Sequence, residues 1–152
     1  MDIKTFLENK YKSRSLNKII YKICQAAEQI SFSIRNDIYY KNIDYEKRNS
    51  DGDIQNPLDV FADKAILESL NQSDVAGYCS EEQDEVIQLD KNGKYLVLSD
   101  PLDGSSNIRN NVSIGTIFSV MPMQNLSFEM ALKQPGINQL CSGFFVYGPQ
   151  TT

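Results

Sequence analysis

Two aspartates in the middle of the chain lie three residues apart and are followed by small polar residues. Asp100 and Asp103 precede Gly104, Ser105 and Ser106. Mg²⁺ prefers oxygen ligands such as these carboxylates and often shares them with a substrate phosphate. The glycine lets the backbone come close to a ligand, and free N–H groups at a helix start bind anions. The spacing therefore predicts a site that holds Mg²⁺ and phosphate together. An Asx-type turn with a capping aspartate is the alternative.

A second acidic group, Glu81 and Glu82, follows a short apolar run at residues 75–79, which we interpret as a strand. Residues 94–99 are also mostly apolar and predict a buried strand directly before Asp100. If these two strands are neighbours, their ends bring the two acidic groups together. Clustered carboxylates repel one another unless a cation neutralises them. The alternative is a solvated acidic run over residues 81–85.

A third pair of acids, Asp53 and Asp59, flanks Pro57. The pair lies between a polar stretch at residues 39–55, which predicts a loop, and a helix that opens at the proline, where proline is tolerated. Taken alone, each acid is an ordinary loop or first-turn residue.

The composition excludes several classes of function. The 152 residues include 15 Lys and Arg against 20 Asp and Glu, a net charge of −5, with no His and no Trp. Without histidine there is no Ser-His-Asp triad and no HExxH zinc site in this chain. The acidic balance argues against a nucleic-acid partner, and no apolar run is long enough to span a membrane. The three isolated cysteines indicate reduced thiols and a cytoplasmic location.

The elements that must position these acids can be read from hydrophobic periodicity. Apolar residues recur every three or four positions over residues 16–38 and predict a long amphipathic helix, with Ser13 or Ser15 as its N-cap. The helix from Pro57 has the apolar stripe Val60, Phe61, Ala65, Ile66 and Leu70. Further strands are predicted at residues 112–121 and 143–147. Helices first and strands later indicate a layered fold of the α+β class, or α/β as the alternative.

The run from Asp100 to Ile108 resembles the signature of class I fructose-1,6-bisphosphatases, which belong to the lithium-sensitive, Mg²⁺-dependent sugar and inositol phosphatases. Ser105 and Ile108 favour this branch, because inositol monophosphatases usually carry a threonine and an aromatic residue there. Other matching motifs follow in order along residues 14–152: Gly52-Asp53, Leu58-Asp59-Val60, Ser80-Glu81-Glu82, Gly93-Lys94-Tyr95, and residues 113–118, 134–136 and 147–149.

The resemblance implies a layered α/β/α arrangement in which two helices pack on a mixed sheet, and it implies roles for the matching residues. The metal ligands would be Glu81, Asp100, the Leu102 carbonyl and Asp103, with Asp53 helping a further ion. Asp59 and Glu82 would polarise the attacking water, and the phosphate would lie on Asp103, Gly104, Ser105 and Ser106. Lys94 and Tyr95 match positions that bind AMP in allosteric relatives.

The implied reaction is hydrolysis of fructose 1,6-bisphosphate to fructose 6-phosphate and phosphate, a step of gluconeogenesis. Two or three Mg²⁺ ions, with Mn²⁺ or Zn²⁺ as substitutes, would activate the water. A non-catalytic regulatory or interaction module is an alternative, and so is a related inositol or nucleotide phosphatase.

The chain also departs from the family pattern. Arg109 stands where the family usually has aspartate, and Asn56-Pro57 replaces a usual Lys-Lys. Relatives are roughly twice as long, so we expect residues 1–152 to form the N-terminal, metal-bearing domain without the C-terminal substrate domain. The expected partners are a sugar bisphosphate and either a C-terminal half or further copies, as in the family's tetramers. Alone, the chain should be a poor enzyme with an exposed sheet edge and apolar surface.

Overall fold

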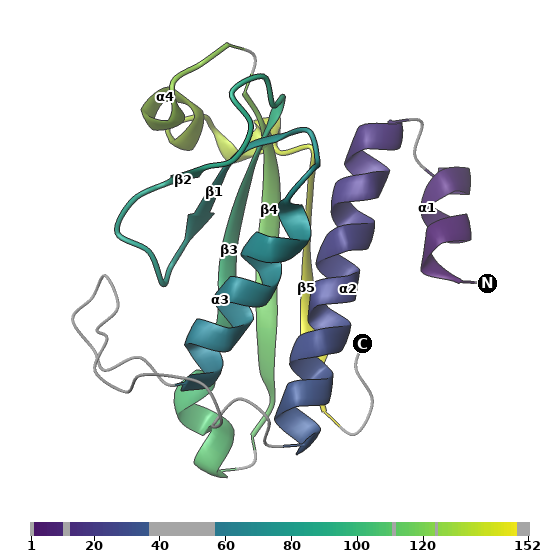
Figure 1. The fold of residues 1–152 in the computed structure, drawn as a ribbon, viewed down its shortest axis with the longest axis vertical. Helices are drawn as coiled ribbons and strands as arrows, with labels where there is room; N and C mark the ends of the chain where they lie inside the picture. The colour runs from purple at the N-terminus through teal and green to yellow at the C-terminus, as the bar shows by residue number, and fades with distance from the viewer. Residues whose placement is uncertain (1, 11–12, 37–56, 111, 124, 149–152) are drawn as a thin grey trace.

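A mixed five-stranded sheet forms the centre of the protein in a computed structural model that describes residues 2–10, 13–36, 57–110, 112–123 and 125–148. The strand order is β2-β1-β3-β4-β5 (Figure 1). β1 and β3 run parallel, and the other neighbouring strands are antiparallel. The strands are β1 (Val75–Ser80), β2 (Ile87–Gln88), β3 (Tyr95–Asp103), β4 (Ile114–Pro122) and β5 (Cys141–Tyr147).

Two helices, α2 (Arg14–Asn36) and α3 (Pro57–Leu70), lie side by side along one face of the sheet (Figure 1). The isoleucines of α2 recur at helical spacing, and Ile19, Ile23 and Ile30 are completely buried. The predicted long helix is therefore confirmed as far as Asn36, and the Ser13 hydroxyl accepts the N–H of Leu16 at 3.3 Å, as a cap does. The predicted 39–55 loop and residues 37–38 lie outside the described residues.

The predicted apolar stripe of α3 is partly wrong. Val60 and Phe61 are only half-buried, whereas Leu58 and Ala62 are completely buried in their place. The buried face of α3 also includes two carboxylates, at positions 59 and 63. Hydrophobic periodicity treats acidic residues as exposed. The apolar stripe predicted for α3 therefore left out Asp59 and Asp63 and did not coincide with the face of the helix that packs on the core.

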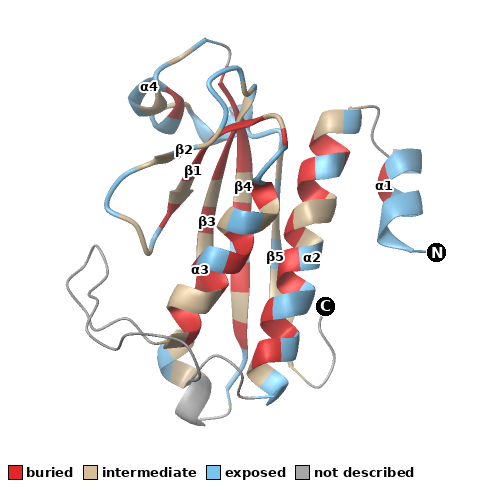
Figure 2. Cartoon of the chain, in the orientation of Figure 1, coloured by how far each residue is buried: buried red, intermediate tan, exposed pale blue. Residues whose placement is uncertain are grey.

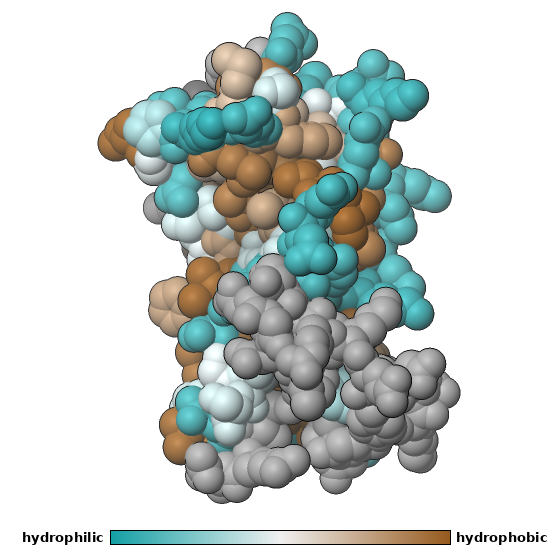
Figure 3. Space-filling model, turned by 90° about the vertical axis from the view of Figure 1, so that its left-hand side faces the viewer, coloured by the Kyte–Doolittle hydropathy of each residue, from teal (hydrophilic) through white to brown (hydrophobic). Residues whose placement is uncertain are grey.

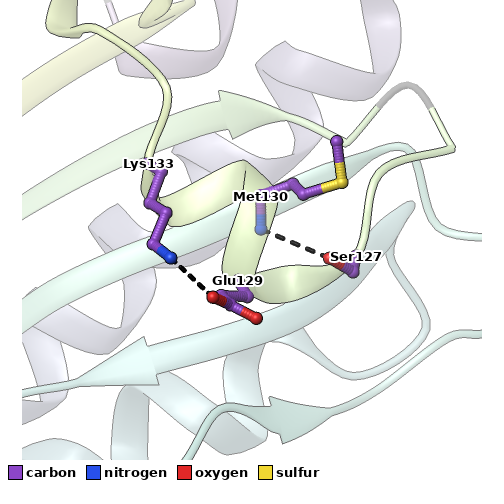
Figure 4. Close-up of polar contacts among 4 residues, drawn as sticks. All are labelled: Ser127, Glu129, Met130 and Lys133. Carbon is purple, nitrogen blue, oxygen red and sulfur yellow. Dashed lines mark hydrogen bonds and ion pairs between the residues drawn. The ribbon is translucent and has the colours of Figure 1, made fainter.

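The main core fills the space between these helices and the sheet, where buried residues form stripes on the facing surfaces (Figure 2). A smaller cluster lies under α4 (Phe128–Leu132) and joins Ala76, Leu96 and Met121 of the sheet to Met123 and Ala131. α4 covers one end of the sheet face that α2 and α3 leave open. The Ser127 hydroxyl caps it by accepting the N–H of Met130 at 3.3 Å, and Lys133 pairs with Glu129 (Figure 4).

Four short elements were not predicted from the sequence: α1 (Ile3–Lys10), β2, α4 and the 3-10 helix Gly136–Asn138. The amide of buried Asn17 on α2 donates to the Leu7 carbonyl of α1 at 3.1 Å, which fixes α1 against α2. No helix in the described part of the chain has both the length and the apolar composition needed to cross a membrane.

The strand ends differ from the predictions at the site. β3 does not stop at Ser99 but continues to Asp103, with a register shift between Asp100 and Asp103. The predicted turn is thus an irregular strand end that still pairs with β4. The predicted strands at 112–121 and 143–147 are confirmed with shifts of one or two residues.

The sheet face opposite α2 and α3 carries exposed apolar side chains. Ile117 of β4 and Phe144 of β5 pair directly across the strands and are 48% and 71% exposed. Hydrophobic surface is also visible in the upper half of the side that carries β2 (Figure 3). Exposed apolar area of this kind is typical of an interaction surface.

Candidate metal and phosphate site

The parallel pairing of β1 and β3 brings the two acidic motifs together. Ser80 lies opposite Ser99, and the N–H of Glu81 donates to the Ser99 carbonyl at 3.1 Å. Glu81, directly after β1, and Asp100, in the last part of β3, therefore lie beside each other toward the carboxyl ends of neighbouring strands. The predicted adjacency of the two strand ends is confirmed.

The Asp100 carboxyl has a strongly perturbed protonation equilibrium. Burial, together with the negative charge of Glu81 and a hydrogen bond between the two side chains, raises the pKa of Asp100 from 3.8 to about 7. The N–H of Leu102, which donates to Asp100 Oδ1 at 3.1 Å, opposes this rise. Two carboxyl groups in contact share a proton because both cannot ionise without a compensating charge. A divalent cation can replace that proton, so the pair fits a metal site.

A sharp backbone turn follows the acids. Gly104 has a φ of +77°, a conformation that side chains other than glycine adopt at a cost. The next residues form a 3-10 helix, Ser105–Asn110, whose Asn107 N–H donates to the Gly104 carbonyl at 2.8 Å. The N–H groups of Ser105 and Ser106 precede this bond, which is the position where helix starts bind anions. The turn thus has the donors that a phosphate needs.

Thr116, a residue not singled out from the sequence, holds the Asp100–Asp103 segment in place. Its completely buried hydroxyl lies 2.7 Å from the Pro101 carbonyl, to which it donates, and 2.6 Å from the Tyr147 hydroxyl. Burial raises the pKa of Tyr147 to about 12, and its bond to Thr116 partly opposes that rise. Thr116 is a single polar residue on the inward face of a predicted strand, and this feature of the sequence could have indicated that its hydroxyl has a structural role.

The two acids expected to act on the water lie on different elements: Asp59 on α3, and Glu82 next to Glu81 in the turn after β1. Asp59 lies in the first turn of α3 and is 5% exposed. Glu82 is half-buried in the turn after β1, where its N–H donates to the Ser80 hydroxyl at 3.2 Å. Asp63, one helical turn after Asp59, is equally buried and was not predicted from the sequence. The i, i+4 spacing of the two aspartates places them on one helix face and could have indicated it.

Lys94 and Tyr95 are separated from the acidic site. Tyr95 begins β3 and Lys94 directly precedes it, which puts them about 17–20 Å from Asp100 at roughly 3.3 Å per residue. The Tyr95 hydroxyl is 3.5 Å from that of Ser13, just before α2. Asp53 and the side chain of Arg109 lie outside the described residues.

The acidic site is not a complete metal cluster in this conformation. Among the residues that the structure describes, no three acidic, histidine or cysteine side chains are gathered closely enough to hold a metal ion. Asp103 is exposed but near enough to raise the pKa of Asp100 slightly. A complete site needs a further ligand beside the Glu81–Asp100 pair.

Comparisons with known proteins identify the family of the chain. Residues 3–152 match the family model for the N-terminal domain of fructose-1,6-bisphosphatase. The class 1 fructose-1,6-bisphosphatase of Rhizobium meliloti is 50% identical over 106 residues, 68% of this chain and 30% of the relative. That of Shewanella oneidensis is 38% identical over 148 residues, 95% of this chain and 46% of the relative.

Solved structures give the same result. The holo form of Leishmania major fructose-1,6-bisphosphatase superposes with a TM-score of 0.86 at 29% identity, covering 99% of this chain and 50% of that one. A putative sedoheptulose-1,7-bisphosphatase from Toxoplasma gondii superposes with a TM-score of 0.77 at 28% identity, covering 99% of this chain and 48% of that one. The chain spans half or less of the length of each of these relatives. It belongs to the fructose-1,6-bisphosphatase family, matching that family's N-terminal domain.

Proposed function

We propose that this chain provides the metal and phosphate site of a Mg²⁺-dependent sugar-bisphosphate phosphatase. The reaction is hydrolysis of fructose 1,6-bisphosphate to fructose 6-phosphate and phosphate. The observation that carries this proposal is the contact between Glu81 and Asp100 toward the carboxyl ends of the parallel strands β1 and β3, where the two carboxyl groups raise the pKa of Asp100 and a cation could bind between them. The names of the relatives support the substrate class.

Each residue has a specific role in the proposal. Glu81, Asp100, the Leu102 carbonyl and Asp103 hold Mg²⁺, or Mn²⁺ or Zn²⁺ in its place, and Asp53 holds a further ion. The metal supplies positive charge and lowers the pKa of a bound water. With the metal bound, Asp59 and Glu82 would orient and polarise the attacking water. The turn from Asp103 through Gly104 and Ser105 to Ser106 binds the phosphate.

The proposed protein is completed by a second part. We assign residues 1–152 to the N-terminal domain, and the sugar-selecting groups to the family's C-terminal domain. The exposed Ile117–Phe144 pair and the edge strand β5 are a suitable surface for that part. Association with a C-terminal half, or assembly into a homo-oligomer, belongs to this proposal. A nucleotide-effector role for Lys94 and Tyr95 stays a prediction.

The test is reconstitution. The chain is mixed with the C-terminal part of a class 1 relative and Mg²⁺, and phosphate release is measured from fructose 1,6-bisphosphate, an inositol monophosphate and a nucleotide monophosphate. We expect little release by the chain alone and the fastest release from fructose 1,6-bisphosphate in the mixture. Asp59→Asn and Glu82→Gln should each abolish it, and the exposed Asp84→Asn should not.

Three outcomes contradict the proposal. Release at full rate by the chain alone would show that no second part is needed. Preference for the inositol or nucleotide substrate would move the protein to a related phosphatase class. Binding of the C-terminal part without any release would favour the interaction-module alternative.

A further inference from the structure

Asp63 of α3 is a buried carboxylate with a hydrogen-bond partner on each oxygen. It is 4% exposed. The Tyr78 hydroxyl donates to Oδ1 at 3.0 Å, and the Gln83 amide donates to Oδ2 at 2.5 Å. Burying a carboxylate costs free energy unless hydrogen bonds compensate it. Tyr78 lies in β1 and Gln83 in the turn after it, so Asp63 connects α3 to both the strand and the turn.

The connection lies between two groups of the proposed site. On one side, Asp63 follows Asp59 by one helical turn on the same buried face of α3. On the other side, Gln83 directly follows Glu82, and its N–H donates to the Ser80 carbonyl at 3.3 Å. The Asp63–Gln83 bond therefore fixes the turn that carries Glu82 to the helix that carries Asp59.

We infer that Asp63 is a positioning residue, which holds the Glu81–Gln83 turn against α3 so that Glu82 and Asp59 serve one site. The inference rests on the proposed function only in that it takes these two acids as site residues. Tyr78 is a dependable donor in this contact, because burial and then the negative charge of Asp63 raise its pKa well above the ordinary value. The phenol therefore stays protonated and remains a donor throughout the neutral range.

The hydrogen-bond chemistry predicts which substitutions are tolerated. In Asp63→Asn, the amide oxygen can still accept from Tyr78, and Gln83 can rotate its amide so that its oxygen accepts from the new NH₂ group. In Asp63→Leu both bonds are lost. In Gln83→Glu two carboxylates face each other and repel. Adding Asp63→Asn to Gln83→Glu restores a donor and an acceptor, so the double variant should recover.

The experiment has one readout without metal and one with it, both on the full 152-residue chain. Hydrogen exchange by NMR follows the backbone amides of Glu82 and Gln83 and the side-chain amide of Gln83. Mn²⁺ affinity is measured by electron paramagnetic resonance. Thermal unfolding identifies variants that lose the fold, and the exposed Asp84→Asn is the matched control.

We expect Asp63→Leu and Gln83→Glu to speed exchange in the turn and to weaken Mn²⁺ binding by about tenfold, a magnitude typical of lost outer-shell support. Asp63→Asn, the double variant and the control should remain near the wild type. If Asp63→Leu does not fold, Gln83→Ala gives the same test, because it keeps the Asp63–Tyr78 bond. Recovery of slow exchange and of Mn²⁺ affinity in the double variant would show that the hydrogen bond between positions 63 and 83 positions the turn, and that the losses in the single variants are not a general loss of stability.

Unchanged exchange and unchanged Mn²⁺ affinity in Asp63→Leu or Gln83→Ala would overturn the inference. If the wild-type chain itself binds no Mn²⁺, the proposed function fails, and the exchange readout still decides the role of Asp63. In that case faster exchange in the variants supports the inference, and unchanged exchange overturns it.

Discussion

The Thr116 hydroxyl lies 2.6 Å from that of Tyr147 and donates to the Pro101 carbonyl at 2.7 Å. Through this buried contact, β4 and β5 support the strand end that carries both aspartates of the proposed site. The site is therefore fixed by a polar contact inside the main core.

Removing this contact should destabilise the protein. Thr116→Val leaves the buried Pro101 carbonyl and the Tyr147 hydroxyl without their partner, so the free energy of unfolding should fall by about 1–3 kcal/mol. Tyr147→Phe removes only the Tyr147 hydroxyl and keeps the bond from Thr116 to the Pro101 carbonyl, so it should lower the free energy of unfolding by less. Urea denaturation measures the free energy of unfolding of both variants. A Thr116→Val protein as stable as the wild type would show that the contact is dispensable.

Gly104 gives a second prediction with an internal control. Its φ of +77° should make Gly104→Ala destabilising by about 1–2 kcal/mol. A Cβ at Gly136 would meet nothing within 4 Å, and its φ is not in the positive range, so Gly136→Ala should be nearly neutral. Thermal unfolding compares the stabilities of the two variants. Equal losses of stability in Gly104→Ala and Gly136→Ala would show that the turn does not impose the left-handed conformation on Gly104.

The stability of the metal-free chain should depend on the ionisation of Asp100. Its pKa is about 7 in the folded protein and 3.8 ordinarily, so the folded state binds the proton more tightly. The stabilisation is fully present below about pH 4 and is lost as the pH rises through about 7. Asp100→Asn should remove this loss, so the difference in unfolding free energy between variant and wild type should grow between pH 4 and 8. A pH-independent difference would contradict this prediction.

The exposed sheet face should matter for association and not for folding. Phe144 is 71% exposed, so Phe144→Ser should leave thermal stability nearly unchanged. It should weaken binding of a relative's C-terminal part by about tenfold or more, as the loss of an aromatic anchor does. Phe32 of α2 is 57% exposed on the helical layer, and Phe32→Ser is the matched control. Equal affinity of both variants, measured by calorimetry, would show that the partner docks elsewhere.

The sequence predicted those elements whose hydrophobic pattern matches their burial. The isoleucines of α2 repeat at helical spacing, and the runs before Ser80 and Ser99 are apolar enough to be buried strands. Placing those strands side by side was sufficient to predict the contact between Glu81 and Asp100.

The features that the sequence did not predict depend on tertiary contacts, which decide whether a polar group is buried and where a short element ends. Asp63 is buried because Tyr78 and Gln83 donate to it, and neither partner is visible in a local pattern. β3 continues through Pro101 because β4 pairs with it up to Asp103. The short α1 and α4 are stabilised by packing on larger elements, so their own sequences gave a weak signal.

Proton release on metal binding tests the central claim most directly. Mn²⁺ binding to the 152-residue chain is measured by calorimetry at pH 7 in buffers of different ionisation enthalpy. Because Asp100 has a pKa of about 7 in contact with Glu81, binding should release about half a proton at this pH. The release should fall toward zero above about pH 8, and Asp100→Asn should abolish it while Asp84→Asn does not. Mn²⁺ binding without proton release, or no binding at all, would contradict the assignment of the Glu81–Asp100 pair as the metal site.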